Sequence, residues 1–140
     1  MGFVCLRTSD AQESFLPGET IVIVDEMGQL PLYYALATIA FIGKSLSAHG
    51  GQNILEPAAL GKVILFGPHM ENFRYLAELF LNNEAAVQIR GPADLEASVR
   101  RFLKSDEMRE RFSANARQLV EKYKGAVVRN LQLMDRYLWR

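Results

Sequence analysis

Short apolar runs alternate with helix-patterned segments along the first two thirds of the chain, and this alternation most restricts its fold. The runs are rich in β-branched residues, as buried strands are. They lie at 3–6, 21–25, 39–43, 63–67 and 85–89, and helical patterns separate them at 30–38, 57–60 and 72–83. Strands and helices in this order predict a parallel sheet covered by helices. We therefore expect an α/β fold with a Rossmann-like open parallel sheet flanked by helices.

From Gly91 onward the pattern is helical to the end of the chain. Pro92 stands where a first helix begins, a position at which its missing N–H costs little. A second helix over 106–124 has acids in its first turn and lysines in its last, as the helix dipole favours. A final amphipathic helix is expected over 126–140. We thus expect one domain, 1–140, with a helical C-terminal tail.

The charge of the chain is balanced overall but uneven along its length. The formal net charge is zero, so no nucleic-acid partner is expected from bulk charge. Residues 90–140 nevertheless hold 12 Lys/Arg against 7 Asp/Glu. This excess fits either a solvated helical face or peripheral contact with an anionic membrane surface.

The cysteine count and the lengths of the apolar runs favour a soluble chain in a reducing compartment. Cys5 is the one cysteine, so no internal disulfide can form, as is usual in a reducing compartment. It lies in the apolar run 3–6 and is predicted to be a small core residue. No apolar run reaches the roughly 18 residues that cross a membrane. The chain is therefore predicted to be soluble, and its abrupt start at a strand favours a fragment of a longer protein.

Three polar, glycine-bearing loops follow predicted strands, at 25–30, 43–56 and 67–72. In open parallel sheets, ligands bind at the carboxyl ends of the strands. In the second loop, Gly50-Gly51 allows a close backbone approach to a ligand. Pro57 opens a short helix whose N-terminus suits a phosphate, and Glu56 at the same mouth can accept hydrogen bonds from both ribose hydroxyls. These residues predict a nucleotide-sugar site.

Plainer interpretations exist for each of these residues. The glycine pair is often only a turn, and Glu56 or Asn53 can simply cap the helix. His49 and His69, the only two histidines, are more often surface residues than functional ones. They have no companion cysteine or acid at metal spacing, so no metal site is predicted. The glycine fingerprints of dinucleotide and P-loop sites are also absent.

The same residues carry a resemblance to a known family. The stretch 25–73 contains "DEMGQL", "YYALATIAFIGKSL", "GGQNILEPA" and "GPHMENF". It resembles the C-terminal half of bacterial 3-deoxy-D-manno-octulosonic acid (Kdo) transferases, which are two-lobed glycosyltransferases of the GT-B type. The resemblance is strong over 25–73 and loose from there to the end of the chain. The "EPA" element alone is shared by many GT-B enzymes.

The resemblance implies a function, a location and a set of site residues. The full-length protein would transfer Kdo from CMP-Kdo to a lipid A precursor at the cytoplasmic face of the bacterial inner membrane, without a cofactor. Glu56 would bind the ribose. Gly50, Gly51 and Asn53 would line the phosphate and sugar pocket. Met27 and Gly28 would contact the nucleotide, and Ser45 would sit near the donor sugar.

Three positions depart from the family pattern, which usually has Gly at Lys44, His at Gln52 and Glu at Gln29. The family's catalytic base and acceptor site belong to an N-terminal lobe. The resemblance therefore implies a donor-binding lobe that has no catalytic residue of its own. Two alternatives stay open: the donor lobe of another GT-B glycosyltransferase or epimerase that uses a UDP-sugar, and a non-catalytic nucleotide-binding or interaction lobe.

Overall fold

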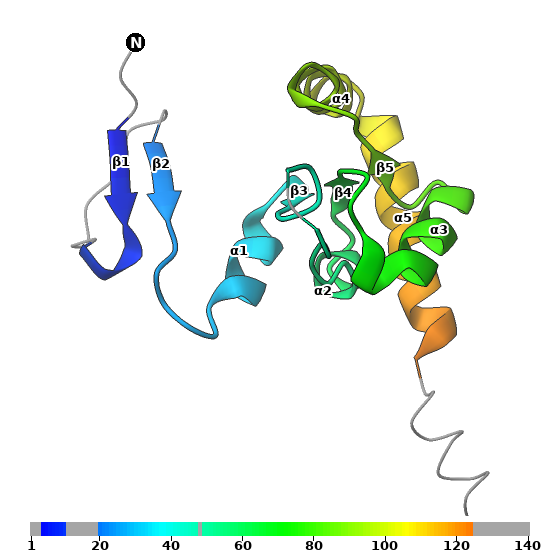
Figure 1. The fold of residues 1–140 in the computed structure, drawn as a ribbon, viewed down its shortest axis with the longest axis horizontal. Helices are drawn as coiled ribbons and strands as arrows, with labels where there is room; N and C mark the ends of the chain where they lie inside the picture. The colour runs from blue at the N-terminus through cyan, green and yellow to red at the C-terminus, as the bar shows by residue number, and fades with distance from the viewer. Residues whose placement is uncertain (1–3, 11–19, 48, 125–140) are drawn as a thin grey trace, which may run out of the picture. The chain divides into compact units, whose positions relative to one another are not determined.

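The structure is a computed structural model, and it describes residues 4–10, 20–47 and 49–124. The chain divides into two compact units, Met1–Leu36 and Ala37–Arg140, which are described separately. Both units contain parallel strands and helices, so the predicted α/β class is confirmed (Figure 1). The predicted strands form two sheets, one in each unit. The amphipathic helix predicted over 126–140 lies outside the described residues.

The first unit contains a two-stranded parallel sheet. Strands β1 (Val4–Arg7) and β2 (Thr20–Ile23) pair in register from Val4–Thr20 to Arg7–Ile23. A 3-10 turn, η1 (Thr8–Asp10), follows β1, and helix α1 (Leu30–Leu36) ends the unit. Asp25 links the segments that follow β1 and β2. Its carboxylate accepts hydrogen bonds from the Thr8 hydroxyl at 2.8 Å and the Ser9 hydroxyl at 2.7 Å.

The burial predicted for the first two strands is wrong. The side chains of β1 and β2 are mostly exposed, and the thiol of Cys5 is exposed rather than part of a core. Apolar composition alone predicted the burial. Two short strands by themselves have too little area to enclose a core.

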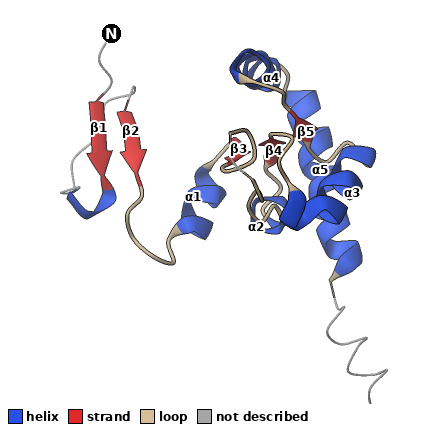
Figure 2. Ribbon diagram, in the orientation of Figure 1, coloured by secondary structure: helices blue, strands red, loops and turns tan. Residues whose placement is uncertain are grey.

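The second unit contains the main core. Strands β3 (Ile39–Ile42), β4 (Val63–Phe66) and β5 (Val87–Gln88) form a parallel sheet in the order β3-β4-β5 (Figure 2). Helix α2 (Leu55–Ala59) and helix α3 (Arg74–Asn82, preceded by the 3-10 turn η2, Glu71–Phe73) connect the strands. Helices α4 (Pro92–Lys104) and α5 (Asp106–Tyr123) follow, as the helical pattern after Gly91 predicts.

Strand β4 is buried on both faces, which is why its sequence is a continuous apolar run. Ile64 and Phe66 face one apolar cluster, to which α2, α3 and α5 contribute side chains. Val63 and Leu65 face a second cluster, where Phe102 of α4 packs edge-on against Phe112 of α5 at 5.1 Å between ring centroids. Helices therefore cover both faces of the sheet and hold the carboxyl end of β4 in place.

Candidate functional site

Two loops meet at the carboxyl ends of β3 and β4. One comprises residues 43–53 and the other residues 67–73, and we call them together the paired loops. The amide of His69 donates to the carbonyl of Ser45 at 2.8 Å, and the amide of Asn72 donates to the carbonyl of Gly50 at 3.3 Å. Of the three loops predicted at the carboxyl ends of one set of strands, these two lie together at the sheet of the second unit. The third predicted loop, after β2, belongs to the first unit.

Ser45 joins the two strands beneath the paired loops. Its side chain is fully buried. The hydroxyl donates to the carbonyl of Ile42 at 2.5 Å and accepts from the amide of Gly67 at 2.8 Å. A Cβ on Gly67 would collide with the backbone of Ser45, so the approach needs glycine. The hydroxyl of Ser45 thus serves the backbone, and its predicted place near a donor sugar stays a prediction.

The glycine pair forms a left-handed turn in the first loop. Gly50 has φ +106° and Gly51 has φ +63°, and both are buried. A Cβ on Gly50 would lie 2.7 Å from the amide nitrogen of the Asn72 side chain, and a Cβ on Gly51 would collide with Met70. The positive φ at both positions is therefore what requires glycine, and the side chains of the second loop pack closely against the pair.

Asn53 and Glu56 lie at the start of α2. The side-chain oxygen of Asn53 accepts from the amide of Leu55 at 3.0 Å, and its amide group lies 3.5 Å from a carboxylate oxygen of Glu56. The Asn53 side chain therefore satisfies one of the free amides of this short helix. Ile54 between them is fully buried and anchors the segment, while Glu56 is exposed and accessible to a ligand.

The remaining predicted positions are spread over both units. Met27 and Gly28 form the turn after β2 in the first unit, where Met27 is 97% exposed and Gly28 has φ +83°. Of the three departures from the family pattern, Lys44 and Gln52 are exposed in the first paired loop. The carbonyl of Gln29 accepts the amide of Leu32 at the start of α1.

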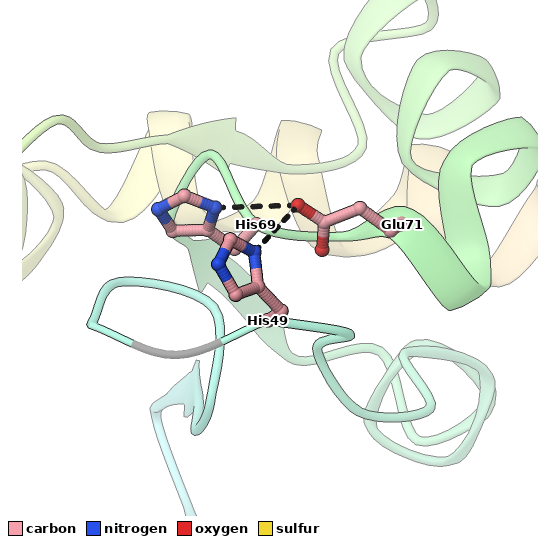
Figure 3. A group of neighbouring side chains, drawn as sticks. All are labelled: His49, His69 and Glu71. Atoms are coloured by element: carbon pink, nitrogen blue, oxygen red, sulfur yellow. Dashed lines mark hydrogen bonds and ion pairs between the residues drawn. The ribbon is translucent and has the colours of Figure 1, made fainter.

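A cluster that the sequence analysis missed lies on the paired loops. His49 Nδ1 lies 3.4 Å, and His69 Nδ1 3.3 Å, from the same carboxylate oxygen of Glu71 (Figure 3). The two imidazoles also meet edge to face, with ring centroids 4.8 Å apart. The premise that the histidines have no acidic companion is therefore wrong. The spacing His-x-Glu at 69–71, on the loop next to the one that carries His49, was the available signal.

A backbone hydrogen bond holds the Glu71 carboxylate in place and lowers its pKa. Its second carboxylate oxygen accepts from the amide of Gly50 at 2.8 Å. That hydrogen bond is the largest cause that lowers the pKa of Glu71 from 4.5 to about 2, and the two histidines contribute further. Glu71 therefore stays ionised to a lower pH than an ordinary glutamate does.

A groove of about 410 Å³ lies beside the paired loops, on the side of β5 and α3. Its lining includes Met70, Glu71, Arg74 and Gln88. None of the seven predicted binding residues, all of which the structure describes, lines this groove. The groove and the segment 50–56 are thus different surfaces that meet at Glu71.

Comparison with known proteins places these features in a family. The sequence model described as "Glycosyl transferases group 1" matches residues 9–119, most of the chain. The chain belongs to the group 1 glycosyl transferases. The family resemblance seen in the motifs of 25–73 is confirmed by curated relatives and by a solved structure.

Two curated relatives are 3-deoxy-D-manno-octulosonic acid transferases. The one from Haemophilus influenzae is 36% identical over 128 residues, which cover 89% of this chain and 30% of the relative. The one from Rickettsia typhi is 35% identical over 137 residues, which cover 95% of this chain and 28% of the relative. The chain thus spans less than a third of the length of these relatives.

A solved structure shares the fold of this glycosyl transferase chain. The C-terminal CMP-Kdo binding domain of WaaA from Acinetobacter baumannii superposes with a TM-score of 0.74 at 29% sequence identity. The match covers 84% of this chain and 61% of that one. In the described residues no helix is long and apolar enough to cross a membrane.

Proposed function

We propose that this chain is the donor-binding part of a Kdo transferase, which binds CMP-Kdo and presents it for transfer to a lipid A precursor. One observation carries the proposal: the fold matches the CMP-Kdo binding domain of A. baumannii, at a TM-score of 0.74. The similarity of this chain to curated Kdo transferases supports the same donor.

The segment 50–56 of the second unit carries the main contacts of the proposed donor site. The exposed carboxylate of Glu56 accepts hydrogen bonds from the ribose hydroxyls of CMP. Asn53 holds the start of α2, because it occupies the amide of Leu55. Gly50 and Gly51 let the backbone approach the phosphate and the sugar. Met27 and Gly28 contribute contacts to the nucleotide.

Ser45 supports the donor site indirectly, without a contact to the donor. Its hydroxyl has two backbone partners, Ile42 and Gly67, so it acts on the donor by positioning the loop that carries the glycine pair. Lys44, on the same loop and exposed, adds a positive charge that is compatible with a phosphate ligand.

The transfer itself requires groups outside this chain. The bond from Kdo to the CMP phosphate breaks as a bond to an acceptor hydroxyl forms, and a general base takes the hydroxyl proton. In the family that the chain resembles, that base and the lipid acceptor site are expected in an N-terminal lobe. We therefore infer that the 140-residue chain binds donor but does not transfer Kdo alone. A lipid acceptor also supports a location at the cytoplasmic face of the inner membrane for the full-length enzyme.

Nucleotide titration tests the donor site. We expect CMP, and not UMP, to shift the NMR signals of residues 27–28 and 43–56. Glu56→Ala should weaken CMP binding at least about tenfold, because it removes charged hydrogen bonds to the ribose. Glu110→Ala removes an exposed carboxylate on α5 and should leave the affinity unchanged.

Other outcomes would contradict the proposal in distinct ways. Preference for UMP would identify the donor lobe of a UDP-sugar glycosyltransferase or epimerase. Binding of neither nucleotide, by this chain or by the full-length protein, would leave an interaction lobe without a donor site. Transfer of Kdo by the 140-residue chain would overturn the inference that the catalytic base lies elsewhere.

A further inference from the structure

We propose that His49, His69 and Glu71 form a binding site for a divalent transition metal of the Zn²⁺ class that bridges the paired loops. The chain contains only two histidines, 20 positions apart, and the fold brings both of them to one carboxylate oxygen. The three side chains converge on a common point (Figure 3). The site is independent of the donor proposal, since none of its three ligands is a predicted donor-binding residue.

The separations between the ligand atoms fit a metal ion. Both Nδ1 atoms lie 3.3–3.4 Å from the Glu71 oxygen, and the candidate ligand atoms all lie within 4.8 Å of one another. Bonds of about 2.0–2.2 Å to a tetrahedral Zn²⁺ place neighbouring ligand atoms roughly 3.3–3.5 Å apart. A direct N–H···O hydrogen bond is typically shorter, at about 2.9–3.0 Å. The two nitrogen–oxygen separations therefore match those of a coordination shell, and a metal would need to draw the two imidazoles closer together.

Two of the three ligands are held by the backbone around them. One oxygen of Glu71 accepts from the amide of Gly50, which leaves the other oxygen directed at the imidazoles. The amide of His69 is bound to the carbonyl of Ser45, and the His69 side chain is 35% exposed. Such outer contacts orient ligands and strengthen metal binding. His49, 84% exposed, lies on the solvent side and completes the site from the other loop.

The ligand set selects the class of metal. Two imidazoles and one carboxylate suit Zn²⁺ and its transition-metal neighbours, whereas Mg²⁺ and Ca²⁺ prefer oxygen ligands. Three protein ligands leave the fourth tetrahedral position for water or for an anionic oxygen of a bound molecule. The metal would thus tie residue 49 of the first loop to residues 69–71 of the second.

Metal titration without nucleotide tests the proposal. The full chain, free of any affinity tag, is used in a Cys5→Ser background, because Cys5 is an exposed thiol and thiolates are metal ligands. Zn²⁺ uptake is followed by calorimetry and Co²⁺ by its visible spectrum, which distinguishes tetrahedral coordination. We expect one saturable Zn²⁺ site and a tetrahedral Co²⁺ spectrum.

Single substitutions assign the ligands. His49→Ala should preserve the fold, because the side chain is largely exposed. It should lower Zn²⁺ affinity at least about tenfold, since loss of a residue that only contacts a metal ligand already costs about that much. His69→Ala should also lower Zn²⁺ affinity, whereas Glu110→Gln should leave it unchanged. Absence of saturable Zn²⁺ binding in the parent chain, or full affinity in His49→Ala, would overturn the proposal. The CMP titration is carried out with a metal chelator present, so that its result does not depend on whether the chain binds Zn²⁺.

Discussion

The amide of Gly50 donates a hydrogen bond to a carboxylate oxygen of Glu71 at 2.8 Å, and this contact joins the two loops that follow β3 and β4. The residues are 21 positions apart, and each belongs to a different feature of the surface. Gly50 is part of the proposed donor segment, whereas Glu71 is shared by the histidine cluster and by the groove beside α3.

Removal of this contact should loosen the first loop. In Glu71→Ala the amide of Gly50 loses its acceptor, and we expect its hydrogen exchange to become faster. NMR hydrogen exchange measures this at the single amide. Glu78→Ala, an exposed carboxylate on the neighbouring helix, is the matched control. Equal protection of Gly50 in both variants would show that the contact does not hold the loop.

Ser45→Ala should destabilise the second unit by about 1–3 kcal/mol, because it strands the buried amide of Gly67 without its acceptor. The variant also loses the hydrogen bond to the carbonyl of Ile42. Chemical denaturation gives the free energy of unfolding. Ser47→Ala, an exposed serine in the same loop, should change that energy little. A similar loss in both variants would argue against the bridging role of Ser45.

Asn53→Ala should lower the free energy of unfolding by about 1 kcal/mol, because the amide of Leu55 loses its partner. Asn53→Asp keeps an acceptor oxygen at that position and should restore most of the stability. Measuring both the free energy of unfolding and the CMP affinity of each Asn53 variant distinguishes a role in helix capping from a role in donor binding. Weak CMP binding in a stable Asn53→Asp chain would show that the amide group itself contacts the donor.

Phe102→Ala should destabilise the chain by about 3–5 kcal/mol, since Phe102 is fully buried and packs edge-on against Phe112. The adjacent Leu103 is 57% exposed, so Leu103→Ala should cost far less. Thermal or chemical unfolding compares the two variants. Comparable losses would contradict the assignment of α4 to the core beneath Val63 and Leu65.

Asp25 should stay ionised to unusually low pH. The Ser9 hydroxyl, then the Thr8 hydroxyl and the Ser9 amide, lower the pKa of its carboxyl from 3.8 to about 2. Because the folded value is depressed, this carboxylate contributes stability above pH 3.8. The contribution is lost as the pH falls through about 2. Carbon NMR of the carboxyl group follows the titration directly.

Ser9→Ala removes the largest of these contributions and should raise the midpoint of Asp25 toward 3.8. Ser47→Ala lies in the other unit and serves as the control. A parent chain that already titrates at 3.8 would disprove the hydrogen-bond arrangement at the end of β2.

Local pattern was enough for much of the fold and part of the site. The apolar runs at 39–43 and 63–67 became β3 and β4. Gly61, which directly follows the predicted helical pattern 57–60, has φ +62°. Parallel strands place their carboxyl ends together, so the meeting of the paired loops followed from chain order. The accessible carboxylate at Glu56 likewise follows from its place before Pro57 at the start of a helix.

Contacts between distant segments decided the rest. An apolar run reads the same whether or not a helix covers it, so the exposure of Cys5 and the strands around it was not predictable from composition. The burial of Ser45 depends on Gly67, 22 positions away. The triangle of His49, His69 and Glu71 forms only when two loops fold against each other, because spacing along the chain does not measure distance across it. Local residue pattern therefore predicts the alternation of strands and helices, and which loops follow the strands. Which polar side chains are buried, and which of them meet, depends on contacts between segments far apart in the chain.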